Sequence, residues 1–246
     1  MHLALVESAV DTLESAIRAE RAGAGRIELC GSLNDGGTTP SAGLIETVTE
    51  RCRIPVFVMI RPRGGGFVYS AVEHDVMLRD IEIARSLGVH GVVIGALSEN
   101  NRVDGARTRE LVRVAEELPV TFHRAFDQLT NPGDGLDQLT DLGVTRVLTS
   151  GGANTALEGA SRIAALVDQS EGRLGIVASG GVRSSNVQEI ITLTGVDEVH
   201  ARITSIVSGG GGGGGSLKLR KRMPENEGAW DELDETRMRD LVNQAG

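Results

Sequence analysis

The 246-residue sequence is poor in aromatic residues and in cysteine. Aromatic side chains make up 2% of the residues, so valine, isoleucine, leucine and alanine must fill any core. The two cysteines, Cys30 and Cys52, exclude a disulfide-rich scaffold, and a reducing compartment would keep both as thiols. The first ten residues lack the basic region of a signal peptide, and Glu7 interrupts their short apolar run. We therefore expect a cytoplasmic protein with no membrane partner.

Positive charge is also in short supply. Twenty-five lysines and arginines stand against 34 aspartates and glutamates, which gives a formal net charge of −9. Such a balance argues against binding to nucleic acid or to anionic lipid. We expect the partner to be a metal ion or a small anionic ligand.

Short β-branched runs alternate with longer helical patterns along the chain, as expected for a parallel sheet built from βαβ units. The predicted strands are Leu3–Glu7, Arg26–Cys30, Val56–Arg61, Gly91–Gly95, Val120–Arg124, Arg146–Ser150, Gly175–Ser179 and Glu198–Ala201. This number of strands, with a length near the roughly 250 residues typical of the fold, predicts a (β/α)₈ TIM barrel. Its working face would be the loops that follow the strands.

Glycines precede every second predicted strand, at Gly23, Gly88, Gly143 and Gly195. Glycine there can adopt the left-handed conformation that ends a helix. The two-strand period indicates quarter-barrel units, or else a chance recurrence of turn chemistry. Ser41 is the expected N-cap of the helix before the third strand.

The pattern changes after residue 207. We expect the barrel over residues 1–207, a glycine-rich, flexible and basic connection over 208–224, and the final barrel helix with the C-terminus over 225–246. The connection holds seven consecutive glycines, Gly209 to Gly215, and then Lys218, Arg220, Lys221 and Arg222. This basic cluster is either a solvated loop or an anion-binding arm. The helical pattern of the last part runs from Trp230 to Gln244.

Alternation along the strands indicates which side chains face the barrel axis. If the apolar neighbours pack against helices, Glu28, Cys30, His123 and His200 point inward. Glu7 and Arg61 are candidates because they end predicted strands. Glu7, Glu28, His123 and His200 are therefore the candidate catalytic residues, with Glu28 or Glu7 as general base and His123 as general acid. The alternative is an internal salt-bridge network that closes the mouth of a non-catalytic scaffold.

Glycine-rich loops follow several strands and offer backbone N–H groups to an anion. Ser150-Gly151 follows the sixth strand and Ser179-Gly180-Gly181 the seventh, although glycine also simply permits a tight turn. Arg61 and Arg63 could clamp a carboxylate or phosphate. The candidate substrate- or anion-binding residues are Arg61, Arg63, Arg124, Asp127, Ser150, Gly151, Ser179, Gly180 and Gly181.

Several motifs together resemble one known family, the copper homeostasis protein CutC family. The motifs are Arg26-Ile27-Glu28-Leu29-Cys30, Gly36-Gly37-Thr38-Thr39-Pro40-Ser41, Ile60-Arg61-Pro62-Arg63-Gly64-Gly65, Thr121-Phe122-His123-Arg124-Ala125-Phe126-Asp127 and Val147-Leu148-Thr149-Ser150-Gly151. The resemblance covers residues 3 to 201 and implies a cytoplasmic, oligomeric α/β barrel associated with copper tolerance and Cu(I) binding through cysteine. It implies no particular reaction, and the glycine run departs from it.

Two functional hypotheses follow. The first is a copper protein with Cys30 as the metal ligand, since a thiolate suits Cu(I). Cys52 ends a helix before the third strand, so a strand's length should keep it more than about 10 Å from Cys30. The second hypothesis is a lyase, isomerase or epimerase that acts on a small anionic or phosphorylated metabolite. The sequence leaves both open.

Overall fold

The structure is a computed structural model that describes residues 4–208 and 229–246. Eight parallel strands pair in chain order and close into a barrel, so the predicted (β/α)₈ fold is confirmed. The strands are β1 (Leu5–Val10), β2 (Arg26–Leu29), β3 (Val56–Met59), β4 (Gly91–Ile94), β5 (Val120–Phe122), β6 (Arg146–Thr149), β7 (Gly175–Ser179) and β8 (Glu198–Ala201).

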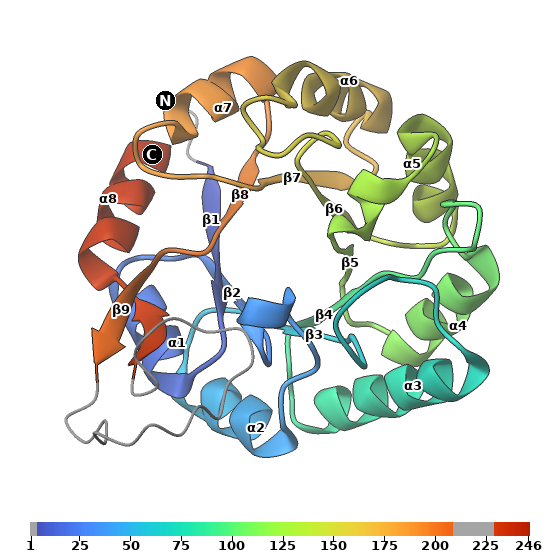
Figure 1. The fold of residues 1–246 in the computed structure, drawn as a ribbon, viewed down its shortest axis with the longest axis horizontal. Coiled ribbons are helices and arrows are strands. Elements are labelled where there is room, and N and C mark those ends of the chain that lie inside the picture. Colours follow the sequence, from blue (N-terminus) through green and yellow to red (C-terminus); the bar gives the residue numbers. More distant parts are fainter. Residues whose placement is uncertain (1–3, 209–228) are drawn as a thin grey trace, which may run out of the picture.

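A ring of helices surrounds the barrel (Figure 1). They are α1 (Leu13–Arg21), α2 (Ala42–Arg51), α3 (Ala71–Ser86), α4 (Gly105–Ala115), α5 (Pro132–Asp141), α6 (Ala160–Ser170), α7 (Val187–Thr194) and α8 (Glu235–Ala245). Two 3₁₀ turns, η1 (Leu33–Asp35) and η2 (Arg124–Gln128), follow β2 and β5. Ser41 caps α2 by accepting a hydrogen bond from the Leu44 N–H, as predicted. Within residues 4–208 and 229–246, no helix has both the length and the apolar character needed to cross a membrane.

The four glycines that precede alternate strands are in the left-handed conformation, as expected. Gly23, Gly88, Gly143 and Gly195 have φ values of +93°, +75°, +83° and +70°. Each lies directly after or one residue beyond the end of a helical segment, where a side chain would strain the backbone.

The first strand is displaced from its predicted position. It runs over Leu5–Val10, not Leu3–Glu7, so Glu7 lies inside the strand and does not end it. Glu7 pairs in register with Arg26 of β2 and His200 of β8. Its carboxylate is ion-paired within the barrel, and this allows the strand to continue past a buried charge.

The tail contains a strand where the sequence predicts only a helix. β9 (Thr204–Ser208) and β10 (Ala229–Leu233) form an antiparallel ribbon, and α8 begins at Glu235. The prediction of helix from Trp230 onward is therefore wrong for its first turn. Ala229 and Leu233 are buried while Trp230 is 40% exposed, which fits a ribbon with one packed face. The glycine run and the basic cluster lie outside the described residues.

The predicted phase of the strands is confirmed. Ile27 and Leu29 are fully buried in the apolar layer between barrel and helices, whereas Glu28 faces the cavity inside the barrel. A small apolar cluster lies apart from that layer: Cys30, Phe57, Met59 and Val93. The barrel interior therefore combines a minor apolar part with a larger polar one.

Candidate functional site

A chain of buried and half-buried charged side chains lies at the amino-terminal end of the barrel strands. The Arg26 guanidinium donates hydrogen bonds to the carboxylates of Glu7 and Glu198. Arg146 also contacts Glu198, with Nε 3.2 Å from Oε1. Both guanidinium groups lie over the Phe57 ring, with Cζ 5.0 and 5.4 Å from its centroid. An internal salt-bridge network thus exists, but it lies at the start of the strands and not at the mouth of the barrel, where the sequence alternative placed it.

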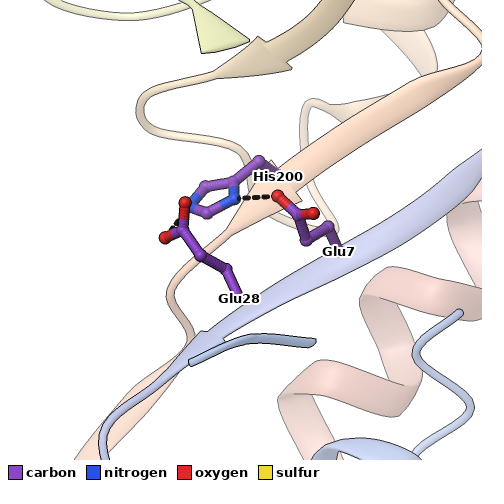
Figure 2. A group of neighbouring side chains, drawn as sticks. All are labelled: Glu7, Glu28 and His200. Atoms are coloured by element: carbon purple, nitrogen blue, oxygen red, sulfur yellow. Dashed lines mark hydrogen bonds and ion pairs between the residues drawn. The ribbon is translucent and has the colours of Figure 1, made fainter. Parts of the chain in front are cut away.

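His200 lies between two carboxylates, Glu7 and Glu28 (Figure 2). Its Nδ1 is 2.7 Å from Glu7 Oε1, and its Nε2 is 3.7 Å from Glu28 Oε2. The Cys30 thiol donates a hydrogen bond to the same Glu28 oxygen at 3.5 Å. Strands β1, β2 and β8 position this group, because their neighbouring residues are in register across the closure of the barrel.

The environment moves the pKa values of this group apart. Burial raises the pKa of Glu7, but the hydrogen bond to His200 and the charge of Arg26 outweigh it and hold the pKa at about 2. Burial raises the pKa of Glu28 above its ordinary value, although the charge of His200 opposes this. Burial lowers the pKa of His200, but the Glu28 charge and the Glu7 hydrogen bond outweigh burial and raise that pKa above its ordinary value. Such separation is typical of acid–base sites.

Next to this group, toward the carboxyl ends of the strands, lies a cavity of about 180 Å³. It is lined by Ala9, Glu28, Leu33, Gly36, Met59, Arg61, Phe67, His123, Arg124, Leu148, Ser179, His200 and Arg202. Most of the polar members come from the ends of strands or the loops after them, which is the working face of this fold. The η1 turn lies over the barrel opening (Figure 1) and contributes Leu33 to the wall.

His123 is a neutral hydrogen-bond donor at this cavity. Its Nδ1 accepts a hydrogen bond from the Ala125 N–H at 3.1 Å, so that the ring proton lies on Nε2. Burial, together with the positive charge of Arg61, lowers the pKa of His123 to about 3. Nε2 is itself buried and has no partner among the described residues. Glu28 Oε1 is likewise buried and has no partner among the described residues.

The two arginines of the third strand's loop have different surroundings. Arg61 donates hydrogen bonds to the carbonyl oxygens of Gly37 (2.8 Å) and Gly65 (2.6 Å), which fixes two loops around the cavity. Its Nε is buried without a partner in the described chain. Arg63 instead pairs with Glu73, the N3 residue of α3, and does not line the cavity.

The loop after β6 already holds an anion, the carboxylate of Asp127. Asp127 Oδ1 accepts hydrogen bonds from the N–H groups of Ser150 (3.0 Å) and Gly152 (3.1 Å), and the Gly151 N–H bonds to Thr149 Oγ1 (2.9 Å). Arg124 Nε completes the shell at 2.8 Å from Asp127 Oδ2. The N–H groups predicted to bind a ligand there are therefore saturated by the protein itself.

The loop after β7, unlike the loop after β6, holds no side-chain carboxylate among the described residues. Ser179 lines the cavity, is 2% exposed and pairs in register with His200. Gly180 and Gly181 form the turn that follows, with φ values of +102° and +70°.

The sequence reasoning missed two charged side chains of the candidate site, Arg26 and Arg202. Arg202 lines the cavity and also donates hydrogen bonds to Leu33 O and the Asp231 carboxylate. Each lies two residues from a predicted inward residue, Glu28 or His200. The same alternation could therefore have found both.

The two cysteines are well separated, as expected. Cys30 follows β2 and is fully buried beside the cavity wall, where burial and the Glu28 charge raise the pKa of its thiol well above the ordinary value. Cys52 follows α2 and precedes β3, at the other end of the barrel. Burial raises the pKa of Cys52 to about 11.

A larger cavity, about 240 Å³, lies outside the barrel near α5 and α6. It is lined by Phe126, Asp127, Pro132, Gly133, Thr149, Gly151, Gly152, Arg162, Ala165, Leu166 and Gln169. Glu28, His123 and His200 line only the smaller cavity. Size alone therefore does not select the site, and we take the smaller cavity as the candidate.

Fold and cavity define a TIM-barrel protein with a polar site at the carboxyl ends of its strands. The CutC family model matches residues 4–205, so the chain belongs to the CutC family. It is 44% identical to the mouse copper homeostasis protein cutC homolog over 238 residues, 96% of this chain and 88% of the relative. The human homolog is 47% identical, with 84% and 76% covered. A crystal structure of CutC from Streptococcus agalactiae has a TM-score of 0.78 and 38% identity, covering 80% of this chain and 98% of that one.

Proposed function

We propose that this CutC family member is a lyase- or isomerase-like enzyme that transfers a proton on a small anionic carbonyl compound. One observation carries the proposal. Glu28 Oε1 and His123 Nε2 are both buried and unpartnered among the described residues, and both residues line one cavity. Unpaired buried polar atoms are costly in the free protein, so a ligand that pairs with both would relieve that cost.

The two groups suit complementary roles in one step. The Glu28 carboxylate takes the proton from the carbon next to a carbonyl group, and the electrons of the C–H bond form the double bond of an enolate. The neutral His123 donates a hydrogen bond from Nε2 to the enolate oxygen as negative charge develops there. Where the α-carbon carries a hydroxyl, its hydroxyl proton passes to the enolate oxygen and the abstracted proton returns to the former carbonyl carbon, which gives an isomerisation. Where the β-carbon carries a leaving group, that group departs with its bonding electrons as the α,β double bond forms and the carbonyl is restored, which gives a lyase reaction.

The residues around Glu28 and His123 position these two side chains and set their protonation states. Glu7 and Arg26 hold His200 against Glu28, and His200 stabilises the ionised form of the base. Arg61 fixes two loops around the cavity through its hydrogen bonds to Gly37 and Gly65. Burial and then the charge of Arg61 lower the pKa of His123 and keep its ring neutral. Arg124 and Arg202 present guanidinium groups at the wall, which can donate hydrogen bonds to an anionic substrate.

Proton exchange with solvent tests this function across a whole class of compounds. A panel of short carboxylated and phosphorylated aldehydes and ketones is incubated with the full chain in D₂O, and loss of the α-proton signal is followed by ¹H NMR. We expect Glu28→Gln to slow exchange at least about 100-fold. Glu46→Gln, at an exposed position of α2, is the matched control. Equal exchange in wild type and Glu28→Gln would refute the assignment.

A second candidate function is Cu(I) binding at Cys30, favoured by a nearby thioether. A β-carbon built on Gly37 would lie 3.1 Å from Cys30 Sγ and 3.7 Å from Met59 Cε, and the two sulfur-bearing side chains belong to one apolar cluster. A thiolate and a thioether fit Cu(I) in chemical type. Metal binding would have to remove the thiol proton, which Glu28 accepts in a hydrogen bond.

Anaerobic competition titration with Cu(I) tests the copper site. Cys30→Ser should lose the tight binding, whereas Cys52→Ser should keep it because Cys52 lies at the other end of the barrel. Equal affinity in wild type and Cys30→Ser would contradict a site at Cys30. The cytoplasmic location and the homo-oligomer remain predictions, the latter measurable by analytical ultracentrifugation.

A further inference from the structure

The turn after β7 offers two backbone donors that the protein leaves unused. The Gly180 carbonyl accepts a hydrogen bond from the Ala156 N–H (2.8 Å), and the Gly181 carbonyl accepts one from Asn186 Nδ2 (2.9 Å). These bonds fix the turn. The N–H groups of Gly180 and Gly181 form no hydrogen bond with any residue that the structure describes.

A guanidinium group is held beside this turn. Arg124 Nε bonds to Asp127 and Nη2 bonds to Ser150 Oγ, both at 2.8 Å. The third nitrogen, Nη1, comes within 3.5 Å of the point where a Gly180 β-carbon would lie. Asp127 therefore orients Arg124 so that one nitrogen remains for a ligand near the glycines. At the next strand, Arg202 lines the same cavity, and its Nε is buried without a partner in the described chain.

A hydroxyl at the cavity wall completes the set. Ser179 is 2% exposed and lines the cavity, and its Oγ forms no hydrogen bond with a residue that the structure describes. A serine hydroxyl in this position can donate a hydrogen bond to a ligand in the cavity.

Two N–H groups, a hydroxyl and two guanidinium groups are all donors, and together they match a tetrahedral oxyanion. We propose that the β7 end of the cavity, where Ser179, Arg124 and Arg202 line the wall and the Gly180–Gly181 turn directly follows Ser179, binds the phosphate group of a phosphorylated substrate. This inference rests on the proposed proton-transfer function and names its substrate class.

The loop after β6 shows why only one of the two Ser-Gly-Gly sequences is free to bind a phosphate group. The β6 loop has the same sequence, but Asp127 occupies the place of the anion there. The phosphate group at β7 would leave the rest of a short substrate directed toward Glu28 and His123, which line the same cavity. The volume of about 180 Å³ is well below the roughly 300–1,000 Å³ of sites for larger ligands, which excludes a nucleotide or polymer from the interior.

Titration of the ¹⁵N-labelled full chain with inorganic phosphate tests the site directly. The amide signals of Gly180 and Gly181 should shift most, while those of Ser150 and Gly152 stay in place. Arg124→Gln should weaken phosphate binding about tenfold, and Ser179→Ala should weaken it severalfold with little effect on folding. Arg162→Gln is the matched control, because this exposed arginine lines only the outer cavity.

The outcomes separate this inference from the proposed function. Phosphate shifts centred elsewhere, or equal affinity in wild type, Ser179→Ala and Arg124→Gln, would overturn the phosphate site. Glu28→Gln should still bind phosphate at the β7 turn even though it has lost proton exchange. If phosphate binds there and no compound of the panel exchanges its proton, the proposed function fails alone. If only unphosphorylated compounds exchange, the phosphate site fails alone.

Discussion

At the scale of single residues, the proposed reaction depends on a histidine that stays neutral. His123 lies in a buried position beside Arg61, and its pKa of about 3 is far below the ordinary 6.5. The unfolded chain therefore binds a proton more readily than the folded one as the pH falls below 6.5. Stability associated with this residue is full above that pH and is lost progressively as the pH falls toward 3.

His123→Gln should reveal this loss. The wild type should lose about 1.4 kcal/mol of unfolding free energy per pH unit below about 6 through His123, whereas the variant has no imidazole to titrate. The difference between the two proteins in urea unfolding should therefore narrow between pH 6 and pH 4. A constant difference, or ring ¹⁵N signals that titrate near pH 6.5, would contradict a buried neutral imidazole.

The sequence predicts which side chains face inward, but it does not give their partners. Alternation alone directs Glu28, His123 and His200 to the barrel axis. The ion pair of Glu7 with Arg26 depends on the register between β1 and β2, which closure of the barrel determines and no local pattern reports. Glu7 was therefore expected at the end of a strand, although it lies inside one.

At the scale of elements, Asp127 joins η2 to the loop after β6. Its carboxylate accepts hydrogen bonds from two backbone N–H groups and from the Thr149 hydroxyl, and it pairs with Arg124. Asp127→Ala should lower the unfolding free energy by about 2–4 kcal/mol, because several buried donors lose their acceptor. Chemical denaturation measures the loss.

Formate should restore part of that stability in Asp127→Ala, since the emptied loop presents N–H groups in the arrangement that binds anions. Asp168→Ala, at an exposed position of α6, is the control and should not respond to formate beyond the wild type. A variant as stable as wild type, or one that formate does not affect, would mean that Asp127 does not fill the loop as an internal anion.

The contribution of β4 could not be predicted from its sequence. Gly91 and Gly95 add no side chain to the interior, and they leave room for the rings of Phe57 and His123. A β-carbon at Gly91 would lie 2.6 Å from Phe57, and one at Gly95 would overlap the His123 ring. A glycine in a strand indicates a close approach, but which ring approaches depends on the neighbouring strands.

At the scale of the whole molecule, net charge and local charge point to different partners. The chain carries a formal net charge of −9, yet Arg61, Arg124 and Arg202 gather at the wall of one cavity. The overall negative charge disfavours polyanions that would contact a wide surface. The local arginines still suit a small anion that enters the barrel. The net charge therefore argues against polyanions such as nucleic acid, but it does not argue against a small ligand that carries a phosphate or carboxylate group.

The C-terminal tail packs against the barrel through residues on both sides of the glycine-rich connection. Ser208 and Ala229 are directly opposed across the β9–β10 ribbon. The ribbon is tied to α1 by the hydrogen bond from the Leu233 N–H to Ser15 Oγ (3.1 Å), and α8 buries Met238 completely. These contacts involve residues outside 209–228.

We therefore expect that a short hairpin turn can replace the connection without loss of stability. Substituting Asn-Gly for residues 209–228 joins an opposed pair with the two-residue loop that antiparallel strands favour. We expect the thermal midpoint to stay within about 2 °C of wild type and phosphate affinity to be unchanged, as a solvated basic loop would require. Truncation after Ser208 should instead unfold the barrel, because it removes the buried face of α8. Loss of phosphate binding in the Asn-Gly variant would favour the anion-binding arm, and unfolding of that variant would show that the connection itself stabilises the barrel.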